Sequence, residues 1–299
     1  MPLVSFTDLM TAAAQDGYAV GYFESWNLES LMAVADAAEA MRSPVLLGFS
    51  GIYLPNPDRV VREPLSVYAA MGMEICRSLR APACLVFNES PYIEAVREAI
   101  RLGFGLVMFS EEETSYDAQV AQVRSVVAEA GRSGVAVEGE PASLPGVGGE
   151  LADVPDDLRL TDPNQACAFV EATGVQALAV NVGQAHLHGK REVRLDLAHL
   201  AKLRDAVAVP LVLHGATSVN RDDLRAAIAL GIRKVNVGSL LKRTYFEAMR
   251  AACLRAGADY NPYEVLGSGK ESDVLAQGRL AMRRAVEDLM RLFGSVNKA

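Results

Sequence analysis

Short, unbroken runs of apolar residues alternate along the chain with longer segments in which apolar residues recur every three or four positions. The runs are rich in Val and Leu, which is typical of parallel strands that are covered on both faces. The segments between them have the periodicity of amphipathic helices, and several end at a glycine, as helices often do. We predict strands at residues 18–23, 44–50, 82–88, 105–110, 135–140, 177–183, 210–216 and 234–240.

Eight strand–helix units in one chain predict a (β/α)8 TIM barrel. An open, doubly wound sheet is the alternative, but the turn after the first strand, YAVGYFESWN, lacks the glycine-rich pattern of a nucleotide-binding sheet. A long amphipathic segment at about residues 274–293 follows the last strand. We therefore expect one TIM-barrel domain over residues 1–299, with this segment as a C-terminal helical extension. The clearest other helical segments are residues 27–42, 90–103, 117–134 and 222–234.

Two long loops interrupt the regular alternation of strands and helices. One covers residues 51–64, and the other is the Pro- and Gly-rich stretch 141–157. Loops that follow the strands of a TIM barrel build its active site. We expect the second loop to be mobile and to lie at the catalytic end of the barrel.

Composition narrows the classes of function. The chain has 299 residues, of which 51% are hydrophobic, and a formal net charge of −8. The negative charge argues against a sequence-independent nucleic-acid binder. No apolar run reaches the ~18 residues of a membrane span, and the N-terminus lacks the pattern of a signal peptide. We expect neither nucleic acid nor membrane as a partner.

The cysteines indicate a reducing compartment. There are four, they are widely spaced, and no two form a CxxC pair. Scattered thiols of this kind are typical of reduced, cytoplasmic proteins, so we expect a cytoplasmic location. The four residues are Cys76, Cys84, Cys167 and Cys253.

Polar side chains gather at the predicted carboxyl ends of the strands, where TIM barrels place functional groups. His186 and His214 end the sixth and seventh strands, so both imidazoles can reach one point. A single strand-end histidine is more often a structural hydrogen-bonding group, and His188 and His199 are weaker candidates. The strand-end set is Glu24, Asn27, Ser50, Asn88, Glu89, Ser110, Glu111, Glu138, Glu140, His186, His214, Asn236 and Ser239.

The loops HGATSV and NVGSL follow the predicted seventh and eighth strands, the common location of a phosphate site in TIM barrels. Gly215 allows backbone N–H groups to approach an anion, and the hydroxyls of Thr217 and Ser239 are further donors. The alternative is that the glycines permit tight turns and the hydroxyls cap helices. We favour the phosphate site because both loops carry the same kind of donor.

Several segments occur in the order and spacing of one known family, and together they cover nearly the whole chain. These segments are residues 2–39, 103–110, 134–140, 160–186, 209–219, 231–249 and 290–295. They resemble the class II, metal-dependent ketose-bisphosphate aldolases, which include the fructose- and tagatose-bisphosphate aldolases. The resemblance implies a TIM barrel, a divalent metal, a phosphorylated sugar substrate and a homodimer or homotetramer.

The resemblance fails at the reacting end of the site. Family members hold zinc with three histidines, and two of these correspond to His186 and His214. The third belongs to a His-x-Asp-His motif, which here reads Val86, Phe87, Asn88, Glu89. The resemblance therefore puts Glu89 at the third ligand and Asn88 at the catalytic aspartate.

Three further family positions differ. The acidic residue of the flexible loop falls at Gly148, with Glu150 two residues on. The aspartate that follows the strand-eight asparagine is Gly238, and the glycine after the strand-six histidine is Leu187. The phosphate end is retained, since six residues match the family pattern or replace like with like. They are Ser50, Gly183, Gly215, Thr217, Asn236 and Ser239.

We expect Glu89, His186 and His214 to hold a divalent metal. Two histidines and a carboxylate suit zinc, and manganese or iron(II) are alternatives. Glu138 and Glu140 are candidates for additional ligands or for hydrogen-bond partners of the histidines. The alternative is that Glu89 faces solvent or pairs with a basic residue and that the site holds no metal.

The predicted catalytic residues are Asn88 and Glu150. An amide has no useful pKa for acid–base catalysis, so Asn88 is expected only to orient a hydroxyl, while Glu150, Glu89 or Glu111 takes over the proton. Glu111 to Glu113 fit better as the acidic first turn of a helix.

The sequence therefore predicts a divergent class II aldolase-like lyase. It would cleave or form a C–C bond, or enolise, a phosphorylated ketose or dihydroxyacetone phosphate. One alternative is a non-catalytic sugar-phosphate-binding protein or accessory subunit, and another is a metal-free enzyme. A Schiff-base mechanism is disfavoured because Lys190 lies in a loop and Lys234 starts the predicted eighth strand, at its wrong end.

Overall fold

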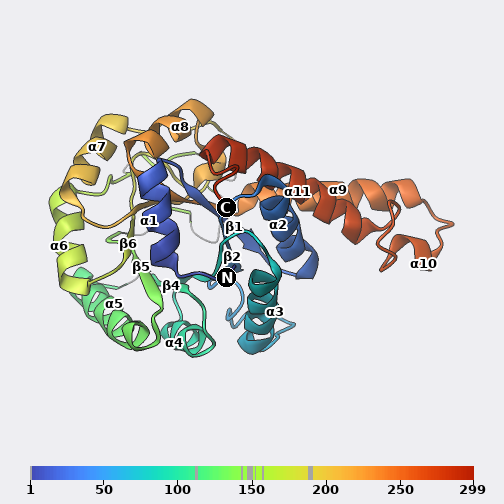
Figure 1. Ribbon diagram of the computed structural model, residues 1–299, viewed down its shortest axis with the longest axis horizontal. Helices are drawn as coiled ribbons and strands as arrows, with labels where there is room; N and C mark the ends of the chain where they lie inside the picture. The colour runs from blue at the N-terminus through green and yellow to red at the C-terminus, as the bar shows by residue number, and fades with distance from the viewer. Residues whose placement is uncertain are drawn as a thin grey trace.

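The computed structural model describes residues 2–111, 114–142, 144–146, 151, 153–156, 158–187 and 191–299. Its parallel strands pair in sequence order and close on themselves, which confirms the predicted TIM barrel (Figure 1). The strands are β1 (Val20–Ser25), β2 (Val45–Ser50), β3 (Ala83–Ser90), β4 (Leu106–Phe109), β5 (Ala136–Gly139), β6 (Ala177–Ala179), β7 (Leu211–Leu213) and β8 (Ile232–Val237).

Helices surround the barrel on its outer face (Figure 1). Short 3-10 turns lie at Gly131–Ser133 and Ala216–Ser218. The helices are α1 (Phe6–Asp16), α2 (Leu28–Met41), α3 (Leu65–Ser78), α4 (Ile93–Arg101), α5 (Tyr116–Ala130), α6 (Pro163–Thr173), α7 (Leu197–Ala206), α8 (Arg221–Leu230), α9 (Ser239–Ala256), α10 (Pro262–Val265) and α11 (Val274–Phe293).

Two apolar clusters hold these layers together. The larger lies between the outer faces of the strands and the surrounding helices. The smaller fills the barrel interior, where Phe6, Leu9 and Met10 of α1 pack against inward-facing residues such as Val20 and Leu46. Helix α1 therefore closes the amino-terminal end of the barrel and leaves the carboxyl-terminal end for function.

The strand boundaries differ from the sequence prediction in ways that the turns explain. The helical pattern at 222–234 stops early because Gly231 adopts φ +126°, so α8 ends at Leu230 and β8 starts at Ile232. Strand β6 is shorter than predicted because side chains take over the hydrogen bonds of its end. The amide of Asn181 donates to Thr161 Oγ1 (2.8 Å) and that of Val182 to Gln184 Oε1 (2.9 Å).

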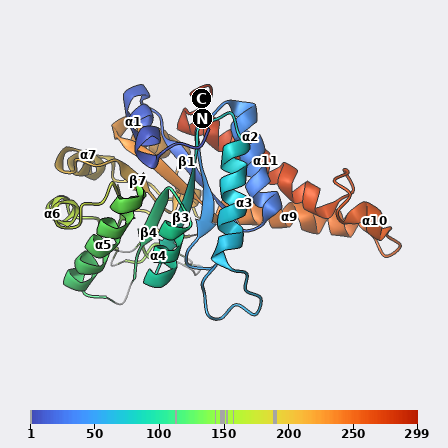
Figure 2. The same cartoon turned by 60° about the horizontal axis from the view of Figure 1, so that its bottom comes forward.

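Helices α9, α10 and α11 form an arm that projects beyond the barrel (Figures 1 and 2). The predicted C-terminal helix is α11, which packs along α9 and α2. The loop at residues 51–64 connects β2 to α3, as expected. Among the described residues, no helix is long and apolar enough to cross a bilayer.

Candidate active site

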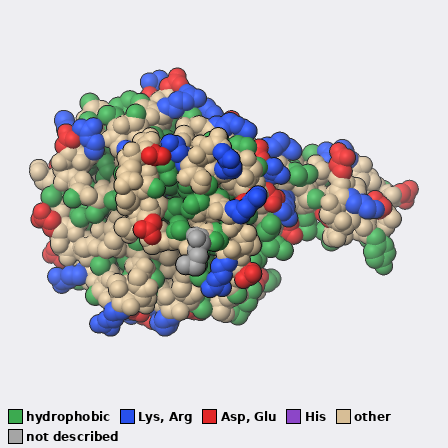
Figure 3. All heavy atoms as spheres, viewed as in Figure 1, with side chains coloured by type: hydrophobic (Ala, Val, Ile, Leu, Met, Phe, Trp, Pro, Cys, Tyr) green, Lys and Arg blue, Asp and Glu red, His purple; other side chains and the backbone are tan. Residues whose placement is uncertain are grey.

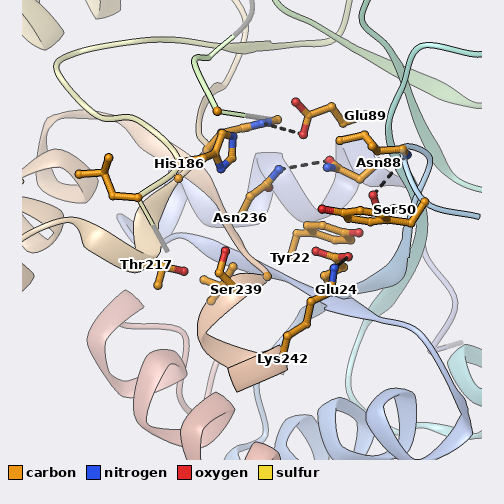
Figure 4. Close-up of a pocket in the computed structure, with 18 of the residues that line it drawn as sticks. Tyr22, Glu24, Ser50, Asn88, Glu89, His186, Thr217, Asn236, Ser239 and Lys242 are labelled. Atoms are coloured by element: carbon orange, nitrogen blue, oxygen red, sulfur yellow. Dashed lines mark hydrogen bonds and ion pairs between the residues drawn. The ribbon is translucent and has the colours of Figure 1, made fainter. Parts of the chain in front are cut away.

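A cavity of about 340 Å³ opens at the carboxyl end of the strands (Figure 4). It brings together most of the residues predicted from the sequence. Gly183 is not among the described residues that line it, and Glu150 and Gly148 lie outside the described residues. The predicted residues that do line it are Ser50, Asn88, Glu89, His186, His214, Gly215, Thr217, Asn236 and Ser239.

A bulge at the end of β3 directs Asn88 and Glu89 into the cavity. The register between β3 and β4 shifts between Phe87 and Ser90, and Glu89 adopts φ +48°. A left-handed conformation at a non-glycine residue costs roughly 1–2 kcal/mol, so the surrounding fold must impose it. The amide of Asn88 is held from across the barrel, since its Oδ1 accepts from Asn236 Nδ2 at 3.2 Å.

A buried chain of polar groups fixes His214. Its Nε2 lies 2.7 Å from Glu138 Oε1, and Lys234 Nζ donates to Glu138 Oε2 (2.7 Å). The same ammonium donates to Asn236 Oδ1 at 2.7 Å. With Nε2 engaged by Glu138, His214 turns Nδ1 toward Glu89 Oε2, 3.6 Å away. Glu138 thus holds the ring in one orientation, as carboxylates do for metal-binding histidines.

The contacts among these groups favour the charged forms of His214 and Glu138. Burial lowers the pKa of His214, but its contacts with Glu138 and Glu89 outweigh burial and raise it to about 10. Burial raises the pKa of Glu138, yet Lys234 and His214 together lower it to about 2. For Glu140, burial outweighs the opposing effects of His214 and the Ser110 hydrogen bond and raises the pKa to about 8.

The three expected metal ligands line one cavity but are not grouped closely enough to hold a metal as they stand. Glu89 Oε1 and His214 Nδ1 are buried without a hydrogen-bond partner among the described residues, and both side chains line the cavity with His186. Within the described part of the chain, no three His, Cys, Asp or Glu residues are already grouped to hold a metal. The carboxylate of Glu89 and the imidazole of His214 nevertheless face each other and leave ligand atoms without a hydrogen-bond partner, which fits a cation.

The phosphate loops lie on the other side of the cavity. Gly215 adopts φ +65°, and a Cβ there would lie 3.2 Å from the carbonyl oxygen of Ala185. Ser239 is the first residue of α9, an 18-residue helix whose amino-terminal N–H groups face the cavity region. Thr217 and Arg243 complete this side, and no carboxylate among the described residues pairs with Arg243. Such a helix start is favourable for an anion.

The sequence prediction misplaced Lys234. It was expected at the wrong end of the eighth strand, but it is the third residue of β8, fully buried, and its side chain rises inside the barrel to Glu138 and Asn236. The length of a lysine side chain, about four carbons, carries the charge past the position of its own Cα. His199, a weaker candidate, lies on α7, where its ring bonds to the carbonyl of Thr161, and His188 is outside the described residues.

Two further residues of the cavity were not singled out from the sequence as acting groups. Tyr22 is buried, and its hydroxyl has no hydrogen-bond partner among the described residues. It lies beside Asn236 in the β1–β8 pairing. Lys242, in the first turn of α9, forms an ion pair with Glu24 at 2.6 Å. An unexplained tyrosine in an apolar strand was the only sequence signal for Tyr22.

Comparison with known proteins agrees with this geometry. The family described as fructose-bisphosphate aldolase class-II matches residues 4–298. The chain is 30% identical over 320 residues to a fructose-bisphosphate aldolase of Thermus caldophilus, covering 99% of this chain and 100% of the relative. It is 29% identical over 299 residues to a sulfofructosephosphate aldolase of Alkalicoccus urumqiensis, covering 100% and 99%. The structure of the YdjI aldolase from Escherichia coli K12 superposes with a TM-score of 0.79, at 26% identity and 99% coverage of both chains.

Proposed function

The chain belongs to the class II fructose-bisphosphate aldolase family, a family of lyases, and we propose that it cleaves or forms a C–C bond in a phosphorylated ketose with the help of a divalent metal. Enolisation of dihydroxyacetone phosphate is the related half-reaction. The observation that carries this proposal is the shared cavity, in which Glu89, His186 and His214 lie opposite Thr217 and Ser239.

We assign metal binding to Glu89, His186 and His214. Zinc suits two imidazoles and a carboxylate, and manganese or iron(II) are alternatives. A bound divalent ion would act as a Lewis acid that polarises the substrate carbonyl. Glu138 keeps Nδ1 of His214 directed at Glu89, and Lys234 balances the charge of Glu138.

The phosphate group of the substrate is assigned to the far side of the cavity. Backbone N–H groups after Gly215 and at the start of α9 would surround it, and the hydroxyls of Thr217 and Ser239 would donate to it. Arg243 adds a positive charge at the same side. A substrate anchored by its phosphate would hold its carbonyl and neighbouring hydroxyl in a fixed position relative to Asn88 and Tyr22. Such positioning lowers the barrier to reaction.

The proton step requires a group other than Asn88. Its amide is held by Asn236 and can orient a hydroxyl but carries no exchangeable acid at neutral pH. We assign the proton donor to Tyr22, which lines the cavity and whose buried hydroxyl has no hydrogen-bond partner among the described residues. Glu150, outside the described residues, stays our candidate for the proton on the donor carbon.

A non-catalytic sugar-phosphate-binding protein is the less favoured function. It would explain the loss of one histidine and of the aspartate. It would not explain why His214 is held by Glu138 and Lys234 in an orientation that suits a ligand. The relatives reported above are also all named as aldolases.

We further propose a cytoplasmic homo-oligomer. All four cysteines are free thiols, which fits a reducing compartment. The arm of α9, α10 and α11 exposes large apolar side chains and is our candidate for the contact between subunits.

Metal content tests the metal site directly. We expect about one equivalent of divalent metal per chain in protein purified without chelator or histidine tag, because orphaned donors converge there. Glu89→Ala should lose most of it, and removal of the metal by chelation should abolish cleavage of ketose phosphates. Glu74→Ala, an exposed carboxylate on α3, serves as the control and should keep its metal.

Absence of metal from the wild-type protein, even after incubation with zinc and manganese, would contradict the metal-dependent reaction. Metal without cleavage of any ketose phosphate, but with binding of dihydroxyacetone phosphate, would favour the binding protein.

A further inference from the structure

A second hollow continues outward from the reacting cavity. Its volume is about 420 Å³, and it shares Glu24, Ser50, Tyr53 and Lys242 with the inner cavity. The two hollows therefore adjoin: Gly215, Thr217 and Ser239 of the phosphate side line only the inner cavity, and Asp58 and Arg59 of the loop at 51–64 line only the outer one. A ketose anchored by its phosphate would extend its opposite end past Glu24 into the outer hollow.

Glu24 and Lys242 form the boundary between the two cavities. Their side chains point toward each other in Figure 4, and Lys242 Nζ lies 2.6 Å from Glu24 Oε1. The same ammonium lies 4.2 Å from the centre of the Tyr53 ring. The positive charge of Lys242 is thus already matched by a carboxylate and an aromatic face.

The space for Glu24 depends on Gly238. A Cβ at position 238 would lie 2.3 Å from Glu24 Oε2. Any side chain there would push the carboxylate out of its position and away from Lys242. The missing side chain at 238 therefore allows β1 to place a carboxylate in the cleft.

The other charges of the outer hollow are also balanced. Arg59 pairs with Glu63 at 2.7 Å and donates to the carbonyl oxygens of Val61 and Leu54. Asp58 adds a further carboxylate to the lining. Among the described residues that line this hollow, both cations are thus engaged, whereas the phosphate side of the inner cavity has Arg243 and a helix start.

We propose that the outer hollow receives an uncharged, hydroxylated aldehyde end, so that the protein acts on ketose monophosphates in preference to bisphosphates, with Glu24 as the specificity-determining residue. This inference rests on the proposed aldolase function. A second phosphate would have to displace Glu24 from Lys242 and would then face an unpaired carboxylate.

The other residues that line the outer hollow suit a polyhydroxylated substrate. Trp26, Tyr53 and Tyr68 present aromatic surface to the hollow, and apolar C–H faces of sugars pack on such rings. Ser50 and the free lone pairs of Glu24 can exchange hydrogen bonds with substrate hydroxyls.

The test compares one ketohexose as its 1-phosphate and its 1,6-bisphosphate, by cleavage kinetics and by calorimetric binding to the metal-loaded protein. We expect wild type to prefer the monophosphate at least 10-fold in kcat/KM or Kd. Glu24→Gln frees Lys242 to meet an anion and should reduce this preference at least 10-fold, mainly by tighter bisphosphate binding. Glu74→Gln makes the same charge change on the surface of α3 and should leave the ratio unchanged.

A wild-type protein that uses the bisphosphate as well as the monophosphate would overturn this inference and leave the aldolase function standing. An unchanged ratio in Glu24→Gln would overturn the role of Glu24. Failure of both esters and of dihydroxyacetone phosphate to bind would overturn the proposed function itself.

Discussion

At the scale of single residues, the cavity combines the pair Asn88 and Glu89 with the hydroxyl of Tyr22. By the family resemblance, Asn88 and Glu89 are expected to replace an acid and a histidine, and the bulge in β3 directs both into the cavity. Tyr22 brings a hydroxyl to the same place from β1. Under the function proposed above, proton transfer would then depend on a different side chain.

Tyr22→Phe tests that dependence. Burial first, and then the carboxylates of Glu24, Glu89 and Glu138, raise the pKa of Tyr22 well above its usual range, so the phenol stays protonated at neutral pH and can act as a donor. Loss of a general acid costs about 10²–10⁴ in rate. We expect kcat for ketose phosphate cleavage to fall at least 10-fold with little change in KM.

Tyr18→Phe is the matched control, because Tyr18 is equally buried but packs with α1 at the closed end of the barrel. Asn88→Asp in the Tyr22→Phe background should recover part of the rate by returning a titratable group to β3. Unchanged kcat in Tyr22→Phe would exclude it as the donor.

The sequence predicts functional residues at strand ends better than residues whose side chains reach the site from the middle of a strand. Asn88, Glu89, His186 and His214 were found because parallel strands carry their functional groups at one end. Lys234 was missed because its side chain spans the distance from mid-strand, and no one-dimensional pattern records that reach. Register across the barrel, not spacing along the chain, brings it to Glu138.

At the scale of elements, helix starts and turns decide where side chains point. Gly231 ends α8 before β8, and Gly238 leaves α9 to begin at Ser239, which turns its first N–H groups to the phosphate side. Periodicity predicted α2 and α11 to within about one residue, because each has a polar cap, but it extended α5 four residues too far, through the 3-10 turn Gly131–Ser133. It overran α8, since a helical pattern continues through Gly231 into the strand.

Asp273 is the cap of α11 and tests how far one such residue stabilises the arm. Its carboxylate accepts from the amides of Leu275 (2.9 Å) and Gly269 (2.8 Å). We expect Asp273→Ala to lower the free energy of unfolding by about 0.5–2 kcal/mol in urea titrations. Asp259→Ala, at an exposed position in the loop after α9, should have little effect.

The contribution of Asp273 should depend on pH with a defined sign. Burial acts to raise its pKa, but the backbone N–H groups of Gly269, Leu275 and Ala276 outweigh it and the native pKa is lowered. The added stability is thus present above the unfolded pKa of about 3.9 and is lost as pH falls through the lower native value. In that acidic range, the difference in the free energy of unfolding between wild type and Asp273→Asn should become smaller. A difference in the free energy of unfolding that grows there would contradict this account.

At the scale of the whole molecule, the projecting arm of α9, α10 and α11 exposes several large apolar side chains. Large apolar side chains on the arm reach high exposure, with Leu254 at 78% and Tyr263 at 86%. Figure 3 shows green side chains on the projecting arm, including its tip. Exposed apolar surface of this kind usually marks a contact with another protein. A second copy of this chain is the partner that we propose.

Sedimentation velocity checks that proposal. We expect wild type to sediment as a dimer or tetramer at micromolar concentration and Leu254→Glu with Tyr263→Glu to shift it toward monomer, because buried, unpaired charge is costly in an interface. Val60→Glu is the control, since Val60 is 99% exposed in the loop at 51–64 and off the arm. A wild-type monomer would contradict the role of the arm.

The space that Glu24 shares with position 238 also affects how such sequences are compared. By the family resemblance, an aspartate is expected at position 238, so Gly238 on its own counts as a missing carboxylate. In three dimensions the strands β1 and β8 are neighbours, and the carboxylate of one fills the room left by the other. The acidic group expected after β8 is thus matched by a carboxylate that β1 supplies to the same space. Relatives with the same chemistry should be sought by a glutamate at position 24 together with a glycine at position 238 rather than by either position alone.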